Sequence, residues 1–137
     1  MNIERFVEPS NRMYEIALGE IKKGKKQSHW MWFIFPQLKG LGKTSTSDYY
    51  GITDVEEATI FLNHPILGKR LIEITNSVLQ IQNKTAFEIF GTPDYLKLKS
   101  SMTLFSLANR KNLVFKNVLD KFYNGYEDGL TKIKLGF

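Results

Sequence analysis

The sequence predicts an all-α protein, folded as one compact bundle of about six helices. Three observations lead to this class. Apolar residues recur at helical spacing in most segments, and capping residues, Gly or Pro separate those segments. Alternation with period two is confined to the C-terminal TKIKLGF, which leaves a minor hairpin there as the alternative to a purely helical chain. A length of 137 residues fits one domain, 1–137, which buries about two-thirds of its unfolded surface.

The first half of the chain predicts three helices. After Pro9-Ser10, apolar residues share one face and predict a helix over roughly residues 10–23. Thr53 and Glu56 match a capping box at the start of a short helix that ends before His64-Pro65. Pro65 then suits the first position of the next helix. That helix keeps one apolar face for four turns: Leu67, Leu71, Ile74, Val78 and Ile81.

The second half predicts three more helices. A short one covers 84–90 and is closed by Gly91. The next starts at Thr92-Pro93 and runs to about residue 109; it is apolar on more than one side, which is typical of a central helix. Its expected buried stripe includes Leu98, Met102 and Phe105. Asn112 caps a last long helix, which Gly125 ends.

Composition excludes several classes of function. The chain has no cysteine and only two histidines, so we expect no disulfide, no metal site and no bound cofactor. The first ten residues hold no apolar stretch like that of a signal peptide. The longest apolar run, Trp30–Phe35, is far shorter than the roughly 20 residues of a membrane span. We therefore expect a cytoplasmic protein without a membrane partner; the sequence fixes no oligomeric state.

The formal charge of +5 allows weak attraction to phosphates. The dense run is KKGKK, Lys22–Lys26. It either grips an anion or simply complements the dipole at a helix end, with Gly24 in the position after that end. The other lysines are dispersed, and no recognition helix with clustered Arg and Asn is visible. We therefore expect no sequence-specific binding to nucleic acid.

The first of three segments that could carry chemistry is SHWMWFIFPQLKGLGKTSTSDYYGI, Ser28–Ile52. Its Gly-Lys pair suggests a phosphate loop, but that motif needs a glycine where Gln37 stands. The glycines still permit tight turns, and Lys43 offers a donor to an anion. Trp30 and Trp32 either fill the core or line a pocket. His29 is an acid, a base or a hydrogen-bonded residue.

The second segment is DVEEATIFLNHPILGKR, Asp54–Arg70. Glu57 precedes Phe61 by one turn, and an apolar neighbourhood would raise the pKa of its carboxyl group, as a general base requires. The alternative is an exposed glutamate at a helix start. Arg70 lies one turn from Leu67 and is a candidate partner for an anion or a carboxylate.

The third segment is FGTPDYLKLKSSMTLF, Phe90–Phe105. Asp94, Lys97 and Ser101 form a polar edge beside the apolar stripe of the helix. This edge either looks into a pocket beside the first segment, or Asp94 only caps its helix.

These segments resemble the signature blocks of a bacterial family, the domain of unknown function 1810. The quoted blocks SHWMWFIFPQLKGLG, YYGI, EEATIFLNHPILGKRL and FGTPDYLKLKSSMTLF carry the resemblance, which covers nearly the whole chain. It implies a small all-helical single domain. Members are sometimes labelled calpastatin, but no residue here supports protease inhibition. The order of blocks is also similar to the NADAR family, named for NAD and ADP-ribose.

The second resemblance implies cleavage of an N-glycosidic bond in an ADP-ribose-like ligand. Glu57 would match the helix-start glutamate of that family, and Asp94, Lys97 or Lys99, and Met102 would match a later block. The tryptophan block departs from the pattern.

We therefore hypothesise one pocket that binds, or hydrolyses an N-glycosidic bond in, an NAD-like, ADP-ribose-like or nucleoside ligand. The alternative is a non-enzymatic binding module with a basic face. The expected catalytic side chains are Glu57, Asp94 and His29. The expected ligand-binding side chains are Trp30, Trp32, Gln37, Lys43, Tyr49, Arg70, Lys97 and Ser101.

Overall fold

The computed structural model describes residues 2–137, and these residues form nine α-helices and one 3-10 turn. The elements are η1 (Ile3–Phe6), α1 (Val7–Lys22), α2 (Met31–Ile34), α3 (Ser45–Tyr49), α4 (Val55–Asn63), α5 (Leu67–Gln80), α6 (Ala86–Phe90), α7 (Asp94–Ala108), α8 (Val114–Phe122) and α9 (Gly129–Leu135). The all-α class is confirmed. The helices exceed the expected six because α2, α3 and α9 are short pieces that periodicity did not predict.

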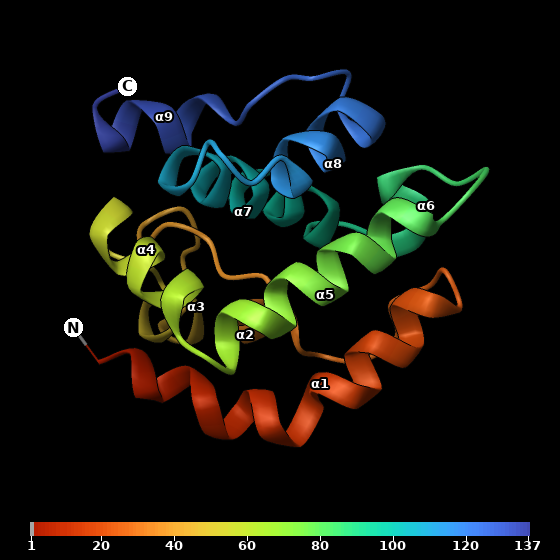
Figure 1. The fold of residues 1–137 in the computed structure, drawn as a ribbon, viewed down its shortest axis with the longest axis horizontal. Helices are drawn as coiled ribbons and strands as arrows, with labels where there is room; N and C mark the ends of the chain where they lie inside the picture. The colour runs from red at the N-terminus through yellow and green to blue at the C-terminus, as the bar shows by residue number, and fades with distance from the viewer. Residues whose placement is uncertain (1) are drawn as a thin grey trace.

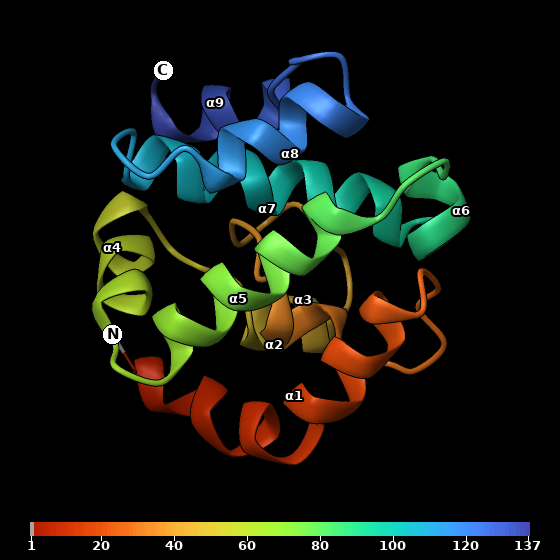
Figure 2. The same ribbon diagram turned by 45° about the vertical axis from the view of Figure 1, so that its right-hand side comes forward.

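Helix α7 is the centre of the molecule. It contacts α4, α6, α8 and α9, and Figures 1 and 2 show it running between the layer of α8 and α9 and the rest of the fold. Leu98, Met102 and Phe105 are fully buried, as predicted. Small residues such as Ser101 and Thr103 are buried on its other sides. Neighbours surround α7 from Leu98 onward, and its partly exposed polar side chains, Asp94 and Lys97, lie in its first turn.

Helix α5 carries the predicted apolar face and packs it against α1, α4 and α8. Leu71, Ile74 and Val78 are at most 1% exposed. Gly68 lets α5 begin close to the end of α4, because any side chain there would collide with the carbonyl group of Leu62. Within residues 2–137, no helix has the length and apolarity needed to cross a membrane.

The segment between α1 and α4 threads through the middle of the fold and carries α2 and α3 (Figure 1). One parallel bridge, between Leu38 and Ile52, ties the middle of this segment to its C-terminal end. Trp30 is fully buried and packs at an angle against Phe35 and Phe90. Of the two roles considered for Trp30, the structure therefore shows core filling, and Phe33, Ile34 and Phe35 are buried with it.

At the C-terminus the structure has the helical alternative rather than the minor hairpin, because these residues form α9. Asp128 caps the helix by accepting the N–H of Thr131, and Gly136 ends it with φ at +82°. Thr131 and Leu135 face inward four residues apart, whereas Ile133 is 73% exposed. The apparent alternation was a helical face with one apolar residue in solvent.

Other boundaries also differ from the expectation: α1 begins at Val7 rather than near residue 10, and α5 begins at Leu67 rather than at Pro65. Asp54, not Thr53, caps α4 by accepting the N–H of Glu57 at 2.9 Å. A complete capping box stands instead at α6, between Thr85 and Glu88. The last long helix, α8, ends at Phe122, before the expected Gly125.

Candidate functional site

One hollow brings together residues from two of the three predicted segments. It encloses about 290 Å³ between the loop before α2 and the start of α7. The predicted residues His29, Trp32, Asp94 and Lys97 line it together with Lys26. We call this the Trp32 hollow. Its volume lies at the lower limit of small-molecule sites.

Two ammonium groups hold the carboxylate of Asp94. The Nζ atom of Lys26 lies 2.9 Å from one Asp94 oxygen and donates to the carbonyl of Ser28 at 2.6 Å. The Nζ atom of Lys97 lies 3.9 Å from the other oxygen. The side chains of Asp94 and Lys97 are 20% and 21% exposed. The trio carries one excess positive charge; Asp94 and Lys97 are partly open to solvent, whereas the Lys26 side chain is only 7% exposed.

The aromatic wall of the hollow is Trp32, which is half-buried. The Nζ atom of Lys97 lies 5.4 Å from the centre of its ring, within the range of a cation–π contact. On the other side, Trp32 and Lys97 border a cavity of only about 10 Å³, which Gln37 also lines. That volume admits a single water molecule at most. Gln37 therefore neighbours the site but does not line the Trp32 hollow.

Glu20, which no pattern in the sequence singled out, holds the loop that forms one wall of the hollow. From the last turns of α1, its carboxylate accepts the N–H groups of Gln27 and Ser28, the Ser28 hydroxyl and the indole N–H of Trp30. Burial would raise the pKa of Glu20, but these hydrogen bonds outweigh it and lower the pKa to about 2. Glu20 is therefore ionised and holds residues 27–30 in place.

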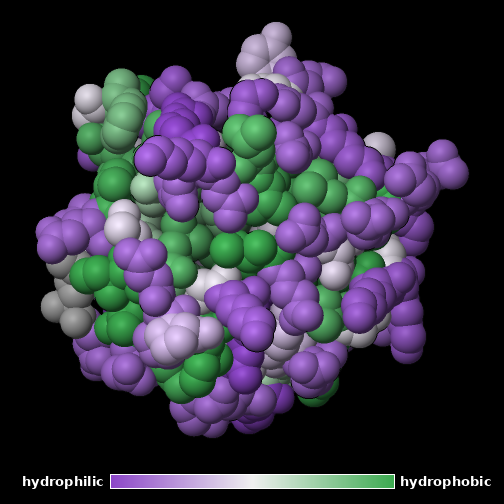
Figure 3. Space-filling view, in the orientation of Figure 1, coloured by the Kyte–Doolittle hydropathy of each residue, from purple (hydrophilic) through white to green (hydrophobic). Residues whose placement is uncertain are grey.

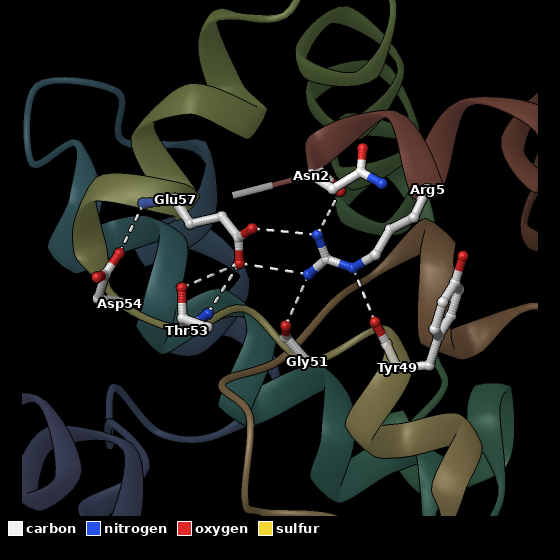
Figure 4. A network of polar contacts seen from close by, with 7 residues as sticks. All are labelled: Asn2, Arg5, Tyr49, Gly51, Thr53, Asp54 and Glu57. Carbon is white, nitrogen blue, oxygen red and sulfur yellow. Dashed lines mark hydrogen bonds and ion pairs between the residues drawn. The ribbon is translucent and has the colours of Figure 1, made fainter.

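Glu57 lies in a separate network that it forms with Arg5 of η1 (Figure 4). Its two carboxylate oxygens accept hydrogen bonds from the guanidinium of Arg5 at 3.1 and 3.3 Å. The N–H of Thr53 donates to it at 2.9 Å. The side chains of Glu57 and Arg5 are 1% and 10% exposed. Glu57 lines neither hollow that contains Trp32.

The remaining donors of Arg5 are also used. They contact the backbone carbonyl groups of Asn2, Tyr49 and Gly51 at 2.6–2.8 Å (Figure 4). This network ties η1 to the loop before α4.

The pKa of Glu57 is lowered, which is opposite to the shift that a general base needs. Burial alone would raise this pKa, but the hydrogen bonds from Arg5 and Thr53 outweigh it. The expected apolar neighbourhood is present, yet Arg5 supplies a counter-charge from the N-terminal turn. The expectation of a raised pKa is therefore wrong, and Glu57 is a buried structural anion.

The other predicted residues are dispersed. Trp30 lies in the core rather than in a pocket wall. Arg70 donates to Ser10 and Asn11 on α1. Ser101 is fully buried in α7, and its hydroxyl is without a hydrogen-bond partner in residues 2–137. Lys43 and Tyr49 are exposed, and neither lines the Trp32 hollow. Of the predicted site residues, only His29, Trp32, Asp94 and Lys97 line this hollow together, and their roles stay a prediction.

Comparisons with known proteins place the chain in a family. The model of a family described as "Protein of unknown function (DUF1810)" matches residues 1–135. The chain is also similar to a solved structure, the conserved hypothetical protein Rv1873 from Mycobacterium tuberculosis, with 46% sequence identity and a TM-score of 0.97. The match covers 99% of this chain and 97% of the other. The comparison with curated proteins gives no match. Neither description names a ligand or a reaction.

Proposed function

This chain belongs to the DUF1810 family of proteins of unknown function, and we propose that it binds a nucleotide-like small molecule in the Trp32 hollow. The observation that carries the proposal is the meeting of an aromatic wall, two lysines and one carboxylate from separate segments. Trp32 offers a surface to a planar ring. Lys26 and Lys97 offer charge to a phosphate.

The two lysine contacts of Asp94 and its partial exposure favour a ligand that carries both an anionic group and hydroxyl groups. Of the two lysines that contact Asp94, Lys97 is the more weakly bound, because its ammonium lies 3.9 Å from the carboxylate. An incoming phosphate can therefore compete with Asp94 for Lys97. The released carboxylate oxygen can then accept a hydrogen bond from a sugar hydroxyl. A nucleotide offers a ring, a sugar and a phosphate together, whereas a free nucleoside lacks the group that Lys97 attracts.

Hydrolysis of an N-glycosidic bond is the enzymatic form of this proposal. Such chemistry uses a carboxylate near the sugar to stabilise an oxocarbenium-like transition state. Asp94 is the carboxylate that lines the hollow, so it takes the role first expected of Glu57. Asp94→Asn should then retain the ligand and abolish its turnover, measured as release of nicotinamide from NAD. Binding without turnover in the parent protein would favour the non-enzymatic form.

Binding can be tested by isothermal titration calorimetry with AMP, ADP-ribose, NAD and adenosine. We expect at least one phosphate-bearing probe to bind, and adenosine to bind more weakly. Trp32→Leu and Lys97→Gln should both weaken binding. Tyr126→Ala removes an exposed aromatic ring that does not line the hollow, and it should leave binding unchanged. Failure of all four probes, or full binding by Trp32→Leu, would contradict the proposal.

A further inference from the structure

Two larger hollows follow the loop that leaves α1, beyond the Trp32 hollow. The first encloses about 440 Å³ between the ends of α1 and α5, and Lys22, Lys23 and Lys84 line it. The second encloses about 460 Å³ beside α6, and Lys25 and Lys84 are among its lining residues. Because both include Lys84, they adjoin. We call this pair the lysine groove.

The lysine groove also neighbours the Trp32 hollow, because Lys26 lines both. The three hollows therefore follow one another from the end of α5, around the loop after α1, to the start of α7. A compact anion fills one of these hollows, whereas a polymer with regularly spaced charges can follow all of them. In Figure 3, hydrophilic side chains crowd the right-hand edge, where Figure 1 shows α6 and the end of α1.

The charge of the groove is strongly positive. Lys22, Lys23 and Lys25 are exposed, and within residues 2–137 none of them forms an ion pair. The ammonium group of Lys84 donates one hydrogen bond to the carbonyl of Gly24 at 2.9 Å. Glu88, which takes part in the capping box of α6, is the one carboxylate among the residues that line the groove. This imbalance attracts a polyanion.

An exposed aromatic ring distinguishes the groove from a patch of charge alone. Phe87 lines the second hollow and is 55% exposed. It packs edge-on against Tyr95, with ring centres 5.5 Å apart, so its orientation is fixed while it faces solvent. Interleaved cations and aromatic rings are the arrangement on which single-stranded nucleic acids stack their bases. A duplex hides its base faces, and inorganic polyphosphate has none.

We propose that the lysine groove binds single-stranded nucleic acid without sequence preference, through its phosphates on the lysines and one base on Phe87. This binding is compatible with the expectation of no sequence-specific nucleic-acid binding, and it does not depend on the ligand of the Trp32 hollow. The KKGKK run thereby has a role besides complementing the dipole of α1.

The test is fluorescence anisotropy with labelled oligothymidylate and oligouridylate of about 12 nucleotides, a length typical of single-strand sites. We expect affinity to fall with salt, with a logarithmic slope near −2.8 for about four phosphate contacts. The triple variant Lys22→Gln, Lys23→Gln, Lys25→Gln should reduce the slope to about −0.7. The matched triple Lys39→Gln, Lys69→Gln, Lys111→Gln removes the same charge from exposed positions elsewhere and should keep the parent slope.

Phe87→Leu tests the aromatic contact while keeping apolar packing against Tyr95. It should weaken oligonucleotide binding on the order of tenfold, the scale of one lost base stack, and leave heparin binding unchanged. Equal effects of the two lysine triples would overturn the proposal. So would tighter binding to a duplex of the same length, or to phosphatidylserine vesicles, than to the single strand. An unchanged affinity in Phe87→Leu would contradict the base contact.

Discussion

Glu57 and Asp94 are both carboxylates at the start of a helix, and both pair with a cation from a distant segment, yet their surroundings differ. Arg5 and Thr53 use both oxygens of Glu57, and its side chain is 1% exposed. Asp94 is 20% exposed, and Lys97 contacts it only at 3.9 Å. The first network is closed, whereas the second borders a hollow of about 290 Å³.

The comparison teaches that burial beside apolar residues does not by itself make a carboxylate reactive. A general base needs a raised pKa and access to a substrate, and Glu57 has neither in this structure. Asp94 is partly exposed, and we propose that its weaker contact with Lys97 is exchanged for a ligand. The carboxylate of Glu57 is bound within the fold, whereas that of Asp94 is the one to which the proposal assigns a ligand.

The largest expected effect comes from breaking the closed network. Glu57→Ala leaves the guanidinium of Arg5 buried without its counter-charge, which should lower the free energy of unfolding by about 3–5 kcal/mol. Glu56→Ala, at the exposed neighbouring position, should change it by less than about 0.5 kcal/mol. Urea denaturation measures both. An equal and small effect of the two variants would show that the Arg5–Glu57 network is not structural.

A smaller loss is expected from Glu20→Ala, which removes the acceptor that organises residues 27–30. A hydrogen bond to a charged group contributes roughly 1.5–3 kcal/mol. Because Glu20 is partly exposed, we expect all of its hydrogen bonds together to contribute a free energy of unfolding within that range. Glu15→Ala, on the exposed side of the same helix, is the control. Because residues 27–30 border the Trp32 hollow, Glu20→Ala should also weaken AMP binding.

The pH dependence of stability sharpens the assignment of Glu20. Its pKa is about 2 in the folded protein, below the value of about 4.3 that an unperturbed glutamate has. A lowered folded pKa contributes stability that is fully present above the unfolded pKa and is lost as the pH falls toward the folded pKa. The stability difference between the parent protein and Glu20→Ala should therefore narrow between about pH 4.3 and 2. A constant difference in denaturation free energy across that window would contradict an ionised Glu20.

The smallest effect on stability is expected for the open carboxylate. Asp94→Asn removes a partly exposed ion pair and should lower the free energy of unfolding by less than about 1 kcal/mol. Its effect on ligands should be larger than its effect on folding. A loss as large as that of Glu57→Ala would mean that Asp94 belongs to the scaffold.

Periodicity and capping residues predicted the fold well where one helix face is buried. The apolar residues expected on one face of α5 and of α7 are buried. Their burial was predictable because it follows from the spacing of apolar residues along a single helix. The hairpin alternative arose because Thr131, Ile133 and Leu135 alternate in the sequence, while only contacts with the rest of the fold decide that Ile133 faces solvent.

The site was predicted only in part because ion pairs between distant segments leave no local signal. Arg5 and Glu57 are 52 residues apart, and a helix-start glutamate looks the same with or without a buried partner. Lys26 belonged to a run whose lysines look alike, although one of them lies beside Asp94. Glu20 looked like an ordinary polar residue of an amphipathic helix.

The most direct test of the central claim is a two-dimensional ¹H–¹⁵N NMR titration of the protein with ADP-ribose or AMP. The two indole N–H signals separate the possibilities, because Trp30 donates to Glu20 in the core and Trp32 borders the hollow. We expect the Trp32 indole signal and the amides of residues 26–32 and 92–97 to shift, while Glu57 and its neighbours stay in place. Shifts centred on Glu57, or none at millimolar ligand, would contradict the assignment of the Trp32 hollow as the binding site.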